Sequence, residues 1–336
     1  MAYKYKHFIP QNTAPSGAKK IGVYKDGIKV TDISLGRMTS PTKEKLYSFG
    51  LVSDIHLWGT EPNWKANTKF DNALSHFENE NCSFCIVCGD LTQTGLYLRT
   101  TESVAGTEYL DEAQFAKYKE ICDNHTIPIY ELMGNHESYY GMPITNNLDK
   151  LQTYTGKNVL SYVVEQGNDL FILLGQPSGS VVMSDTDFTW FEQTLEANQD
   201  KRCFVFVHSY IEEDSGDAKD FRENSIFDGW GKTNAFINLL NQYDNVILFH
   251  GHSHIKFEYQ VIDKNANYTE KNGFKSVHIP SLGRPRDVDV TASSTPYADS
   301  EAQGYIVDVY DDCIVLNGMD LINNEFVPLG VYKIDT

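Results

Sequence analysis

The stretch Asn245-Val246-Ile247-Leu248-Phe249-His250-Gly251-His252-Ser253-His254 runs from an apolar strand directly into closely spaced histidines. Imidazole is the commonest metal ligand in proteins because it is mostly neutral at physiological pH. Gly251 allows the backbone to turn sharply and to come close to whatever the histidines bind. The stretch therefore indicates a metal-binding loop with His252 and His254 as ligands, whereas His250 is expected to end the strand and pack beneath the loop.

Four other apolar runs end in residues of the same kind. The runs cover residues 48–52, 84–88, 127–133 and 203–207, and the residues after them include Asp54 and His56, Asp90, Asn135 to Glu137, and His208. A solvated loop with two histidines is a common chance event, but five such strand endings in one chain are not. The pattern favours one shared site.

Helical patterns separate these strands, because apolar residues recur at helical spacing in four segments. The segments contain Phe70, Ala73, Leu74 and Phe77; Phe115, Tyr118, Ile121 and Cys122; Phe188, Phe191 and Leu195; and Phe236, Leu239, Leu240 and Tyr243. The third segment follows Ser184-Asp185-Thr186-Asp187, which resembles a capping box at the start of a helix. Strands that alternate with helices form open sheets whose ligands bind at the carboxyl ends of the strands.

The last third of the chain has strand patterns without helical ones. These patterns cover residues 255–262, 274–279, 304–310, 313–318 and 326–333. We therefore expect an α/β (α+β) fold in which two mixed sheets pack together with helices outside.

Residues 1–45 differ in composition from residues 46–336, which we interpret as the main domain. Lys25-Asp26-Gly27 lies between two short apolar runs, and Asp-Gly in this setting predicts a β-hairpin. The hairpin is expected either to form an appendage that binds a protein partner or to add an edge to the main domain.

The composition is that of an ordinary globular protein, with 336 residues of which 41% are hydrophobic and 22% charged. A net charge of −18 argues against an extended nucleic-acid or membrane surface. No stretch resembles a signal peptide or has the ~20 apolar residues of a membrane span, so a cytoplasmic location is expected. The six irregularly spaced cysteines also favour a reducing compartment, with Cys82, Cys85 and Cys88 packed in the core rather than binding a soft metal.

The strand endings offer seven candidate metal donors. They are Asp54, His56, Asp90, Asn135, His208, His252 and His254. A catalytic zinc takes about three protein ligands, so seven donors suit two ions that share a carboxylate. Mixed nitrogen and oxygen ligation without thiolate fits Mn, Fe, Zn, Co or Ni, and two such ions activate a hydroxide for in-line attack at phosphorus.

The ordered set Asp-x-His, Gly-Asp, Gly-Asn-His-Glu, His and Gly-His-x-His, over residues 54–254, resembles the calcineurin-like metallophosphoesterase superfamily. The resemblance implies a four-layer αββα sandwich with a dinuclear centre at the carboxyl ends of the strands. It implies one metal held by Asp54, His56 and His254, a second held by Asn135, His208 and His252, and Asp90 as the bridge. It also implies that His136 is the general acid beside the phosphate, with Asn135 and His136 facing the substrate.

The second motif of this set, Gly-Asp, indicates which subgroup of the superfamily the chain resembles. Gly89-Asp90-Leu91-Thr92-Gln93 lacks the acid and the arginine of Ser/Thr protein phosphatases and is more similar to bacterial class III cyclic-nucleotide phosphodiesterases. Without that acid, the usual carboxylate partner of His136 is missing. The phosphodiesterases often have an Asp where Gln93 stands, so the match to them is partial. We expect a phosphodiesterase that acts on a small phosphoester, with nucleotides among the candidates. A phosphomonoesterase of the same fold, or a non-catalytic protein such as a phage-associated one, is the alternative.

Five further residues are candidates for secondary roles. Arg284 and Arg286 suit the binding of a phosphate group, because guanidinium matches its geometry, and solvation of their loop is the alternative. Glu137 is expected to orient the loop that carries His136. Tyr210 and Trp230 are expected either to line a substrate pocket or to belong to the core.

Overall fold

A computed structural model describes residues 20–25, 28–34, 43–57, 65–93, 107–137, 144–177, 181–211, 230–258, 267–270, 273–286 and 300–336. The helices are α1 (Lys65–Asn79), α2 (Thr107–Asp123), α3 (Ile144–Thr155), α4 (Asp185–Ala197) and α7 (Thr233–Leu240). The strands of the first half are β1 (Lys20–Lys25), β2 (Ile28–Ser34), β3 (Tyr47–Val52), β4 (Cys85–Cys88), β5 (Ile129–Leu132), β6 (Ser161–Gln166) and β7 (Asp169–Leu174). Those of the second half are β8 (Arg202–Val207), β9 (Val246–His250), β10 (Tyr268–Thr269), β11 (Lys275–His278), β12 (Gln303–Val309), β13 (Cys313–Asp320) and β14 (Glu325–Asp335).

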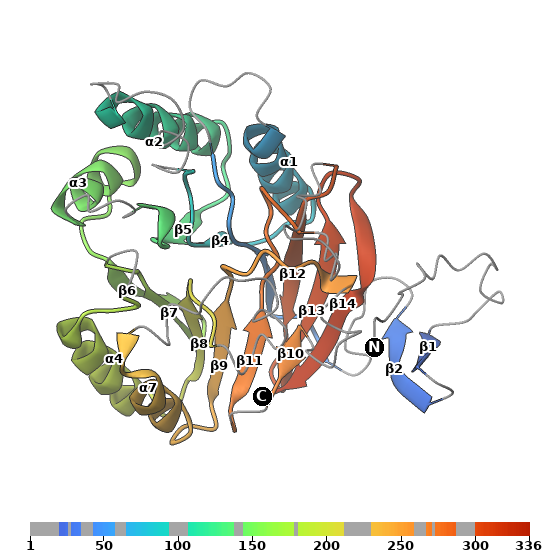
Figure 1. Cartoon of the computed structure of the whole chain (residues 1–336). Coiled ribbons are helices and arrows are strands. Elements are labelled where there is room, and N and C mark those ends of the chain that lie inside the picture. Colours follow the sequence, from blue (N-terminus) through green and yellow to red (C-terminus); the bar gives the residue numbers. More distant parts are fainter. Residues whose placement is uncertain are drawn as a thin grey trace, which may run out of the picture.

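Two six-stranded mixed sheets form the centre of the molecule (Figure 1). One has the strand order β10-β11-β9-β8-β7-β6 and the other has the order β14-β13-β12-β3-β4-β5. In the first sheet β7, β8, β9 and β11 are parallel, and in the second β3, β4 and β5 are parallel. The carboxyl ends of neighbouring parallel strands therefore open on the same edge of each sheet.

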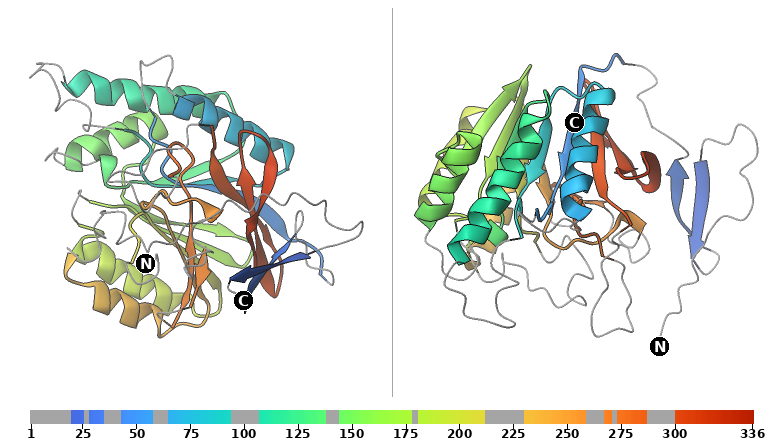
Figure 2. Two further views of the ribbon diagram at one scale, coloured as in Figure 1. Left: turned by 45° about the vertical axis from the view of Figure 1, so that its right-hand side comes forward. Right: turned by 90° about the horizontal axis from the view of Figure 1, so that it is seen from above.

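Side-chain alternation along the strands builds four layers. On β8, Phe204 and Phe206 point between the two sheets, whereas Cys203 and Val205 point to the outer face. Because successive side chains of a strand face opposite sides, a strand buried on both faces reads as one continuous apolar run. Helices α1, α2 and α3 cover one sheet and α4 and α7 cover the other, as Figure 2 shows. The predicted αββα arrangement is confirmed.

The predicted strands before the polar endings are all observed, as β3, β4, β5, β8 and β9, with small shifts at their ends. The capping box is also present, since Ser184 is the N-cap of α4 and its hydroxyl accepts a hydrogen bond from the backbone N–H of Asp187 at 3.0 Å. None of the helices in the described part of the chain is long and apolar enough to span a bilayer.

Two expectations need correction. The strand expected over residues 255–262 is wrong where the structure describes it, because Ile255 makes only an isolated bridge to Arg286 and residues 256–258 join no strand. Residues 259–262 lie outside the described ranges. Helix α3 and the hairpin of β6 and β7 had no counterpart among the expected elements.

The predicted N-terminal hairpin is observed as the antiparallel pair of β1 and β2, beside β14 (Figure 1). Its Asp26-Gly27 turn lies outside the described residues. The division into an appendage of residues 1–45 and a main domain of residues 46–336 stays a prediction.

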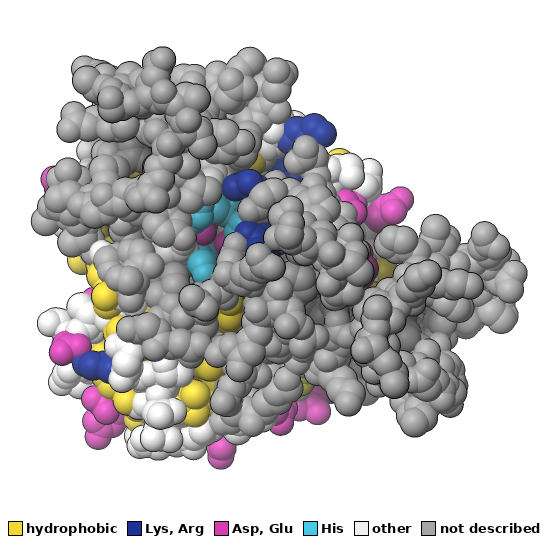
Figure 3. Space-filling view, in the orientation of Figure 1, with side chains coloured by type: hydrophobic (Ala, Val, Ile, Leu, Met, Phe, Trp, Pro, Cys, Tyr) yellow, Lys and Arg dark blue, Asp and Glu magenta, His cyan; other side chains and the backbone are white. Residues whose placement is uncertain are grey.

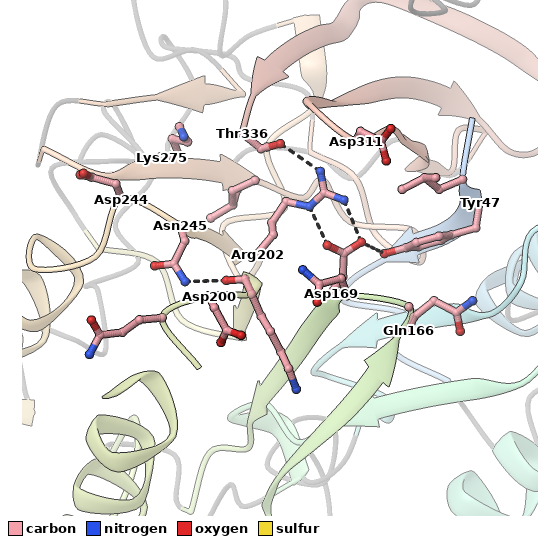
Figure 4. Close-up of a pocket in the computed structure, with 16 residues that line it drawn as sticks. Tyr47, Gln166, Asp169, Asp200, Arg202, Asp244, Asn245, Lys275, Asp311 and Thr336 are labelled. Atoms are coloured by element: carbon pink, nitrogen blue, oxygen red, sulfur yellow. Dashed lines mark hydrogen bonds and ion pairs between the residues drawn. The ribbon is translucent and has the colours of Figure 1, made fainter. Parts of the chain in front are cut away.

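A cavity of about 570 Å³ lies at the amino ends of the strands, at the opposite edge from the candidate ligands. Arg202 fills part of it and donates to both carboxylate oxygens of Asp169, at 2.9 and 2.7 Å (Figure 4). The same guanidinium donates to the carbonyl of Tyr310 and to the hydroxyl of Thr336, while Tyr47 donates to Asp169. Burial and then Asp169 raise the pKa of Tyr47 above its usual range. This network links β3 to β7 and β8, and it engages the guanidinium of Arg202 in hydrogen bonds within the protein.

Candidate metal centre

Five loops meet where the parallel strands of the two sheets end. In one sheet, β3 is followed by Asp54 and His56, β4 by Asp90, and β5 by Asn135 and His136. In the other sheet, β8 is followed by His208, and β9 by His252 and His254. The loops are joined across the sheets, because the backbone N–H of His252 donates to Asp54 Oδ2 and His208 Nδ1 donates to the Cys88 carbonyl. Within one sheet, the Ser53 hydroxyl donates to the same carbonyl. All seven predicted ligands are buried at this junction.

The backbone is strained at the candidate ligands. Asp54, His56, Asp90, His252 and His254 all have φ between 49° and 72°, in the left-handed region that residues other than glycine rarely adopt. Among the described residues only two other non-glycine residues share this conformation. Such strain persists where the surrounding structure determines it and is concentrated at functional sites.

Two glycines allow the loops to approach one another. A Cβ atom on Gly134 would lie 2.2 Å from Asp90 Oδ1, and one on Gly251 would lie 2.0 Å from Ser53 Oγ. Both distances are shorter than any non-bonded contact, so only glycine fits at these positions. Gly251 thus allows a close approach to Ser53, whereas the close approach to a group bound by the histidines stays a prediction.

The side chains form two groups that share Asp90. The first group contains Asp54, His56, Asp90 and His254, and the second contains Asp90, His208 and His252, with the donor atoms of each group within 4.8 Å of one another. In the first group His254 Nε2 lies 3.0 Å from both Asp54 Oδ1 and His56 Nε2. In the second, His208 Nε2 lies 3.1 Å from Asp90 Oδ2. Asn135, the remaining predicted ligand, is fully buried in the loop that also carries His136.

Hydrogen bonds behind the ligands fix which atoms face the centre. His208 Nδ1 donates to the carbonyl of Cys88 at 2.8 Å, and His254 Nδ1 donates to the carbonyl of Arg284 at 3.0 Å. With the proton on Nδ1, the lone pair of Nε2 points inward, which is the arrangement that metal-binding histidines use. Asp90 is held similarly, because its Oδ1 accepts the backbone N–H of His136 at 2.9 Å.

The electrostatics of the site favour ionised carboxylates. Burial opposes ionisation of Asp90, but His208 and His136 outweigh it and lower its pKa to about 2. Burial likewise opposes ionisation of Asp54, yet the imidazoles of His254 and His208 hold its pKa below the usual range. Burial opposes the charged form of His208, but Asp90 and Asp54 raise its pKa to about 10. A cation bound at His208 Nε2 would replace that proton, since metal binding releases protons from its ligands.

The donor set fits metal ions. Asp54 Oδ1, Asp90 Oδ2 and His208 Nε2 are buried and make no hydrogen bond of good geometry within the described part of the chain, although they face side chains of the same centre at ion-pair distances. Buried polar atoms are normally paired, because leaving one unpaired is costly. Three such atoms directed into one space, surrounded by imidazoles and carboxylates without thiolate, suit borderline divalent or trivalent ions.

His136 and Glu137 occupy the edge of the centre. His136 Nε2 lies 3.8 Å from Asp90 Oδ2, and its ring packs against that of His56 at 4.5 Å. Glu137 is fully buried. Its carboxylate accepts hydrogen bonds from the backbone N–H of Thr92 at 2.9 Å and from that of Gly134 at 2.7 Å. Glu137 thus holds the loop that carries His136, as the sequence suggested, and it also joins this loop to the one after β4. Burial, then the charge of Asp90, raises the pKa of Glu137 to about 7.

Residues 281–286 form a loop that supports the first group. Its Gly283 N–H donates to the carbonyl of Asp54, and the carbonyl of Gly283 accepts from the buried Lys69 of α1 at 2.8 Å. Arg284 donates from Nη1 to Gln93 Oε1 at 3.1 Å, and Arg286 is buried, with its backbone N–H donating to the carbonyl of His254. Arg284 is thereby held beside the centre, and sequence reasoning gave no signal of its contact with Gln93.

The remaining candidates belong to the packing around the site. His250 ends β9 and is buried, with its ring edge-on to that of His278 at 5.4 Å between centroids, and burial lowers its pKa to about 3. Tyr210 is fully buried with its ring 5.6 Å from that of His252. Trp230 packs against the core beneath α4 and donates to the carbonyl of Met183. The expectations for His250 and for a core role of Trp230 agree with these positions.

The cysteines do not contribute to the centre. All six are free thiols, and burial raises the pKa of Cys85 and Cys88 well above the usual value. Both lie on β4 inside the core, so the soft-metal reading of the Cys82, Cys85 and Cys88 run finds no support in their positions.

Histidine side chains of the site are visible from outside. Figure 3 shows histidine side chains next to Lys or Arg side chains on the face seen in Figure 1. His136 retains 8% and His252 7% of their exposure, so a small ligand can reach the imidazoles at the mouth of the centre.

Comparisons with known proteins agree with this architecture. The sequence pattern of the family described as calcineurin-like phosphoesterase matches residues 47–256, which contain every candidate ligand. The sequence matches no curated protein significantly.

Two solved structures share the fold at low sequence identity. A dimetal phosphatase from Danio rerio is 13% identical, with a TM-score of 0.58 over 87% of this chain and 99% of that chain. A purple acid phosphatase from seeds of yellow lupin (Lupinus luteus) is 12% identical, with a TM-score of 0.52 over 86% of this chain and 53% of that chain.

Proposed function

Because the chain belongs to the calcineurin-like phosphoesterase family, we propose that it is a metal-dependent phosphodiesterase acting on small phosphoesters. The observation that carries the proposal is the convergence of buried carboxylates and imidazoles into two groups with Asp90 in common. A shared carboxylate between two adjacent sites is what a pair of ions ~3.5–4 Å apart requires.

We infer that the ions are Mn, Fe or Zn, since the donors are imidazole and carboxylate without thiolate. Asp54, His56 and His254 would hold one ion, Asn135, His208 and His252 the other, and Asp90 both. Such a pair, when bound, supplies an activated hydroxide and neutralises charge at phosphorus. The carbonyl groups behind His208 and His254 keep their Nε2 atoms directed at the ions.

His136 is our candidate for moving a proton at the leaving oxygen. Its Nδ1 donates to the carbonyl of Gln93 at 3.1 Å, so Nε2, which lies 3.8 Å from Asp90 Oδ2, is the atom that would exchange a proton with the substrate. Burial lowers the pKa of His136, although Asp90 opposes this, so the buried site favours the neutral ring before substrate binds. The negative charge of a phosphoester beside Nε2 raises that pKa and favours the protonated form that a general acid needs.

The preference for diesters rests on the second block of the motif. Gln93 stands where protein phosphatases have an acid, and Thr92 is fixed by Glu137 rather than facing the centre. The resemblance to cyclic-nucleotide phosphodiesterases in this block supports a diester substrate, with nucleotides among the candidates. A monoester substrate is the second candidate, because Arg284 beside the centre suits a more highly charged phosphate.

The test is the ratio of kcat/KM for bis-p-nitrophenyl phosphate to that for p-nitrophenyl phosphate, with Mn²⁺ present and Asp90→Asn as the blank. A higher value for the diester supports the proposal. A higher value for the monoester replaces it with a phosphatase, and rates equal to the blank for both esters favour a non-catalytic protein.

A further inference from the structure

Gln93 is fully buried where the loop after β4 meets the loop after β3. Its backbone N–H donates to the carbonyl of Leu57 at 3.0 Å, and Thr92 bridges to Leu57. The residue is thus held in place by its backbone, independently of its side chain.

Gln93 contacts two groups of the site at once. Its backbone carbonyl accepts from His136 Nδ1 at 3.1 Å, and its side-chain Oε1 accepts from Arg284 Nη1 at 3.1 Å. His136 and Arg284 are 148 residues apart in the sequence (284 − 136), and each is positioned by a different atom of the same residue.

The guanidinium of Arg284 is close enough to act on the candidate ligands. The backbone carbonyl of Arg284 accepts from His254 Nδ1 at 3.0 Å, and its Nη1 donates to Gln93, whose own carbonyl holds His136 beside Asp90. Arg284 therefore contributes positive potential where a phosphate would bind. Because an amide is neutral, the contact with Gln93 Oε1 holds the guanidinium without cancelling its charge.

The other atom of the amide points to the same conclusion. Gln93 Nε2 is buried and donates no hydrogen bond within the described ranges. A buried donor without an acceptor is unfavourable, so such an atom at the edge of an anion site is typical of a group that ligand binding completes.

We propose that Gln93 is a positioning residue that holds His136 and Arg284 around the phosphate group. Because the Gln93 side chain is neutral, it leaves the positive charge of Arg284 available to the negatively charged phosphoester. This inference rests on the proposed function, because it concerns the same substrate group. It assigns a role to the position at which a carboxylate would have been expected beside His136.

The test compares Gln93→Glu with Gln93→Met in Mn²⁺-loaded protein. Glu keeps the length and the acceptor but adds a negative charge beside the phosphate, whereas Met keeps the volume and removes the contact with Arg284. Gln242→Glu is the matched control, because Gln242 is exposed after α7 and its side chain donates locally to the carbonyl of Asn238. Titration calorimetry measures the Kd of inorganic phosphate, a dianion at alkaline pH, and of dimethyl phosphate, a monoanion.

Coulomb energy is proportional to charge, so the extra carboxylate repels the phosphate dianion with about twice the energy with which it repels dimethyl phosphate. Because binding energy depends on the logarithm of Kd, the Kd of phosphate should rise by about the square of the factor for dimethyl phosphate. We expect about threefold for dimethyl phosphate and about tenfold for phosphate in Gln93→Glu. Gln93→Met should weaken the binding of both, and Gln242→Glu should match the wild type. Metal content and melting temperature should stay unchanged in all three variants.

Wild-type affinity for both anions in Gln93→Glu, or an equal loss for both, overturns the inference. If Gln93→Glu loses its metal, Gln93→Met decides: weaker phosphate binding at full metal content supports the inference, and unchanged binding refutes it. Binding is measured without turnover, so phosphate binding that depends on Gln93 in a protein that hydrolyses neither ester refutes the proposed function alone. A protein that binds neither anion refutes both.

Discussion

Gly134→Ala is expected to disable the centre without disturbing the rest of the fold. The new Cβ would lie 2.2 Å from Asp90 Oδ1 and 2.5 Å from the backbone nitrogen of Asp90. A carbon and an oxygen that are not bonded approach to about 3.3 Å, so Asp90 and the added methyl group must separate by about 1 Å. A displacement of about 1 Å in a catalytic site costs about 100-fold in rate.

The assay is kcat/KM for bis-p-nitrophenyl phosphate together with metal content per chain. Gly167→Ala is the matched control, because its Cβ would meet nothing within 4 Å, although its φ of 62° makes alanine unfavourable there. We expect the control to lose about 1–2 kcal/mol of stability and to keep its metal and activity. A Gly134→Ala protein with full metal content and wild-type kcat/KM would refute the role given to the close approach at Asp90.

Three further predictions concern other parts of the molecule. Arg202→Ala should lower the free energy of unfolding by about 3–5 kcal/mol, because it removes the cation from the buried Asp169 carboxylate and leaves Tyr47 as its side-chain donor; a denaturation midpoint equal to that of the wild type contradicts this, and metal content should not change. The His125 hydrogen bond lowers the pKa of Glu78 from 4.5 to about 2, so Glu78 stabilises the fold above pH 4.5 and this contribution is lost as the pH falls through 2; urea midpoints of wild type and Glu78→Gln should converge over that range, and parallel curves would argue against it. His136→Ala should reduce hydrolysis of esters with poor leaving groups more than that of nitrophenyl esters, and equal losses would indicate a positioning role instead.

The fold could be predicted largely because its strands are buried on both faces. Runs such as Cys203 to Val207 stay apolar without alternation, and they end abruptly at polar residues that metal chemistry explains. The hairpin of β6 and β7 carried a signal too, because Gly167-Asn168 lies between two apolar runs, but no donor follows β7 to draw attention to it. Around Phe257 the apolar spacing is typical of a strand, yet the backbone N–H of Phe257 donates to the side chain of Gln303 instead of a neighbouring strand.

The candidate ligands could also be found from the sequence, since each follows a strand directly. Their supporting contacts could not. The Gln93 to Arg284 hydrogen bond joins residues 191 positions apart, and Lys69 reaches the carbonyl of Gly283 from a helix on the outer layer. Such contacts depend on where two loops meet in space, and local sequence patterns carry no information about that distance.

The most direct test of a centre built around Asp90 is metal content per chain, measured by elemental analysis after loading with excess Mn²⁺ and removal of unbound ions. We expect about two ions in the wild type and one or fewer in Asp90→Asn, with turnover reduced by orders of magnitude in the variant. Circular dichroism should show that both proteins are folded. Fewer than one ion per chain in the wild type, or equal metal content in the two proteins, would contradict the account.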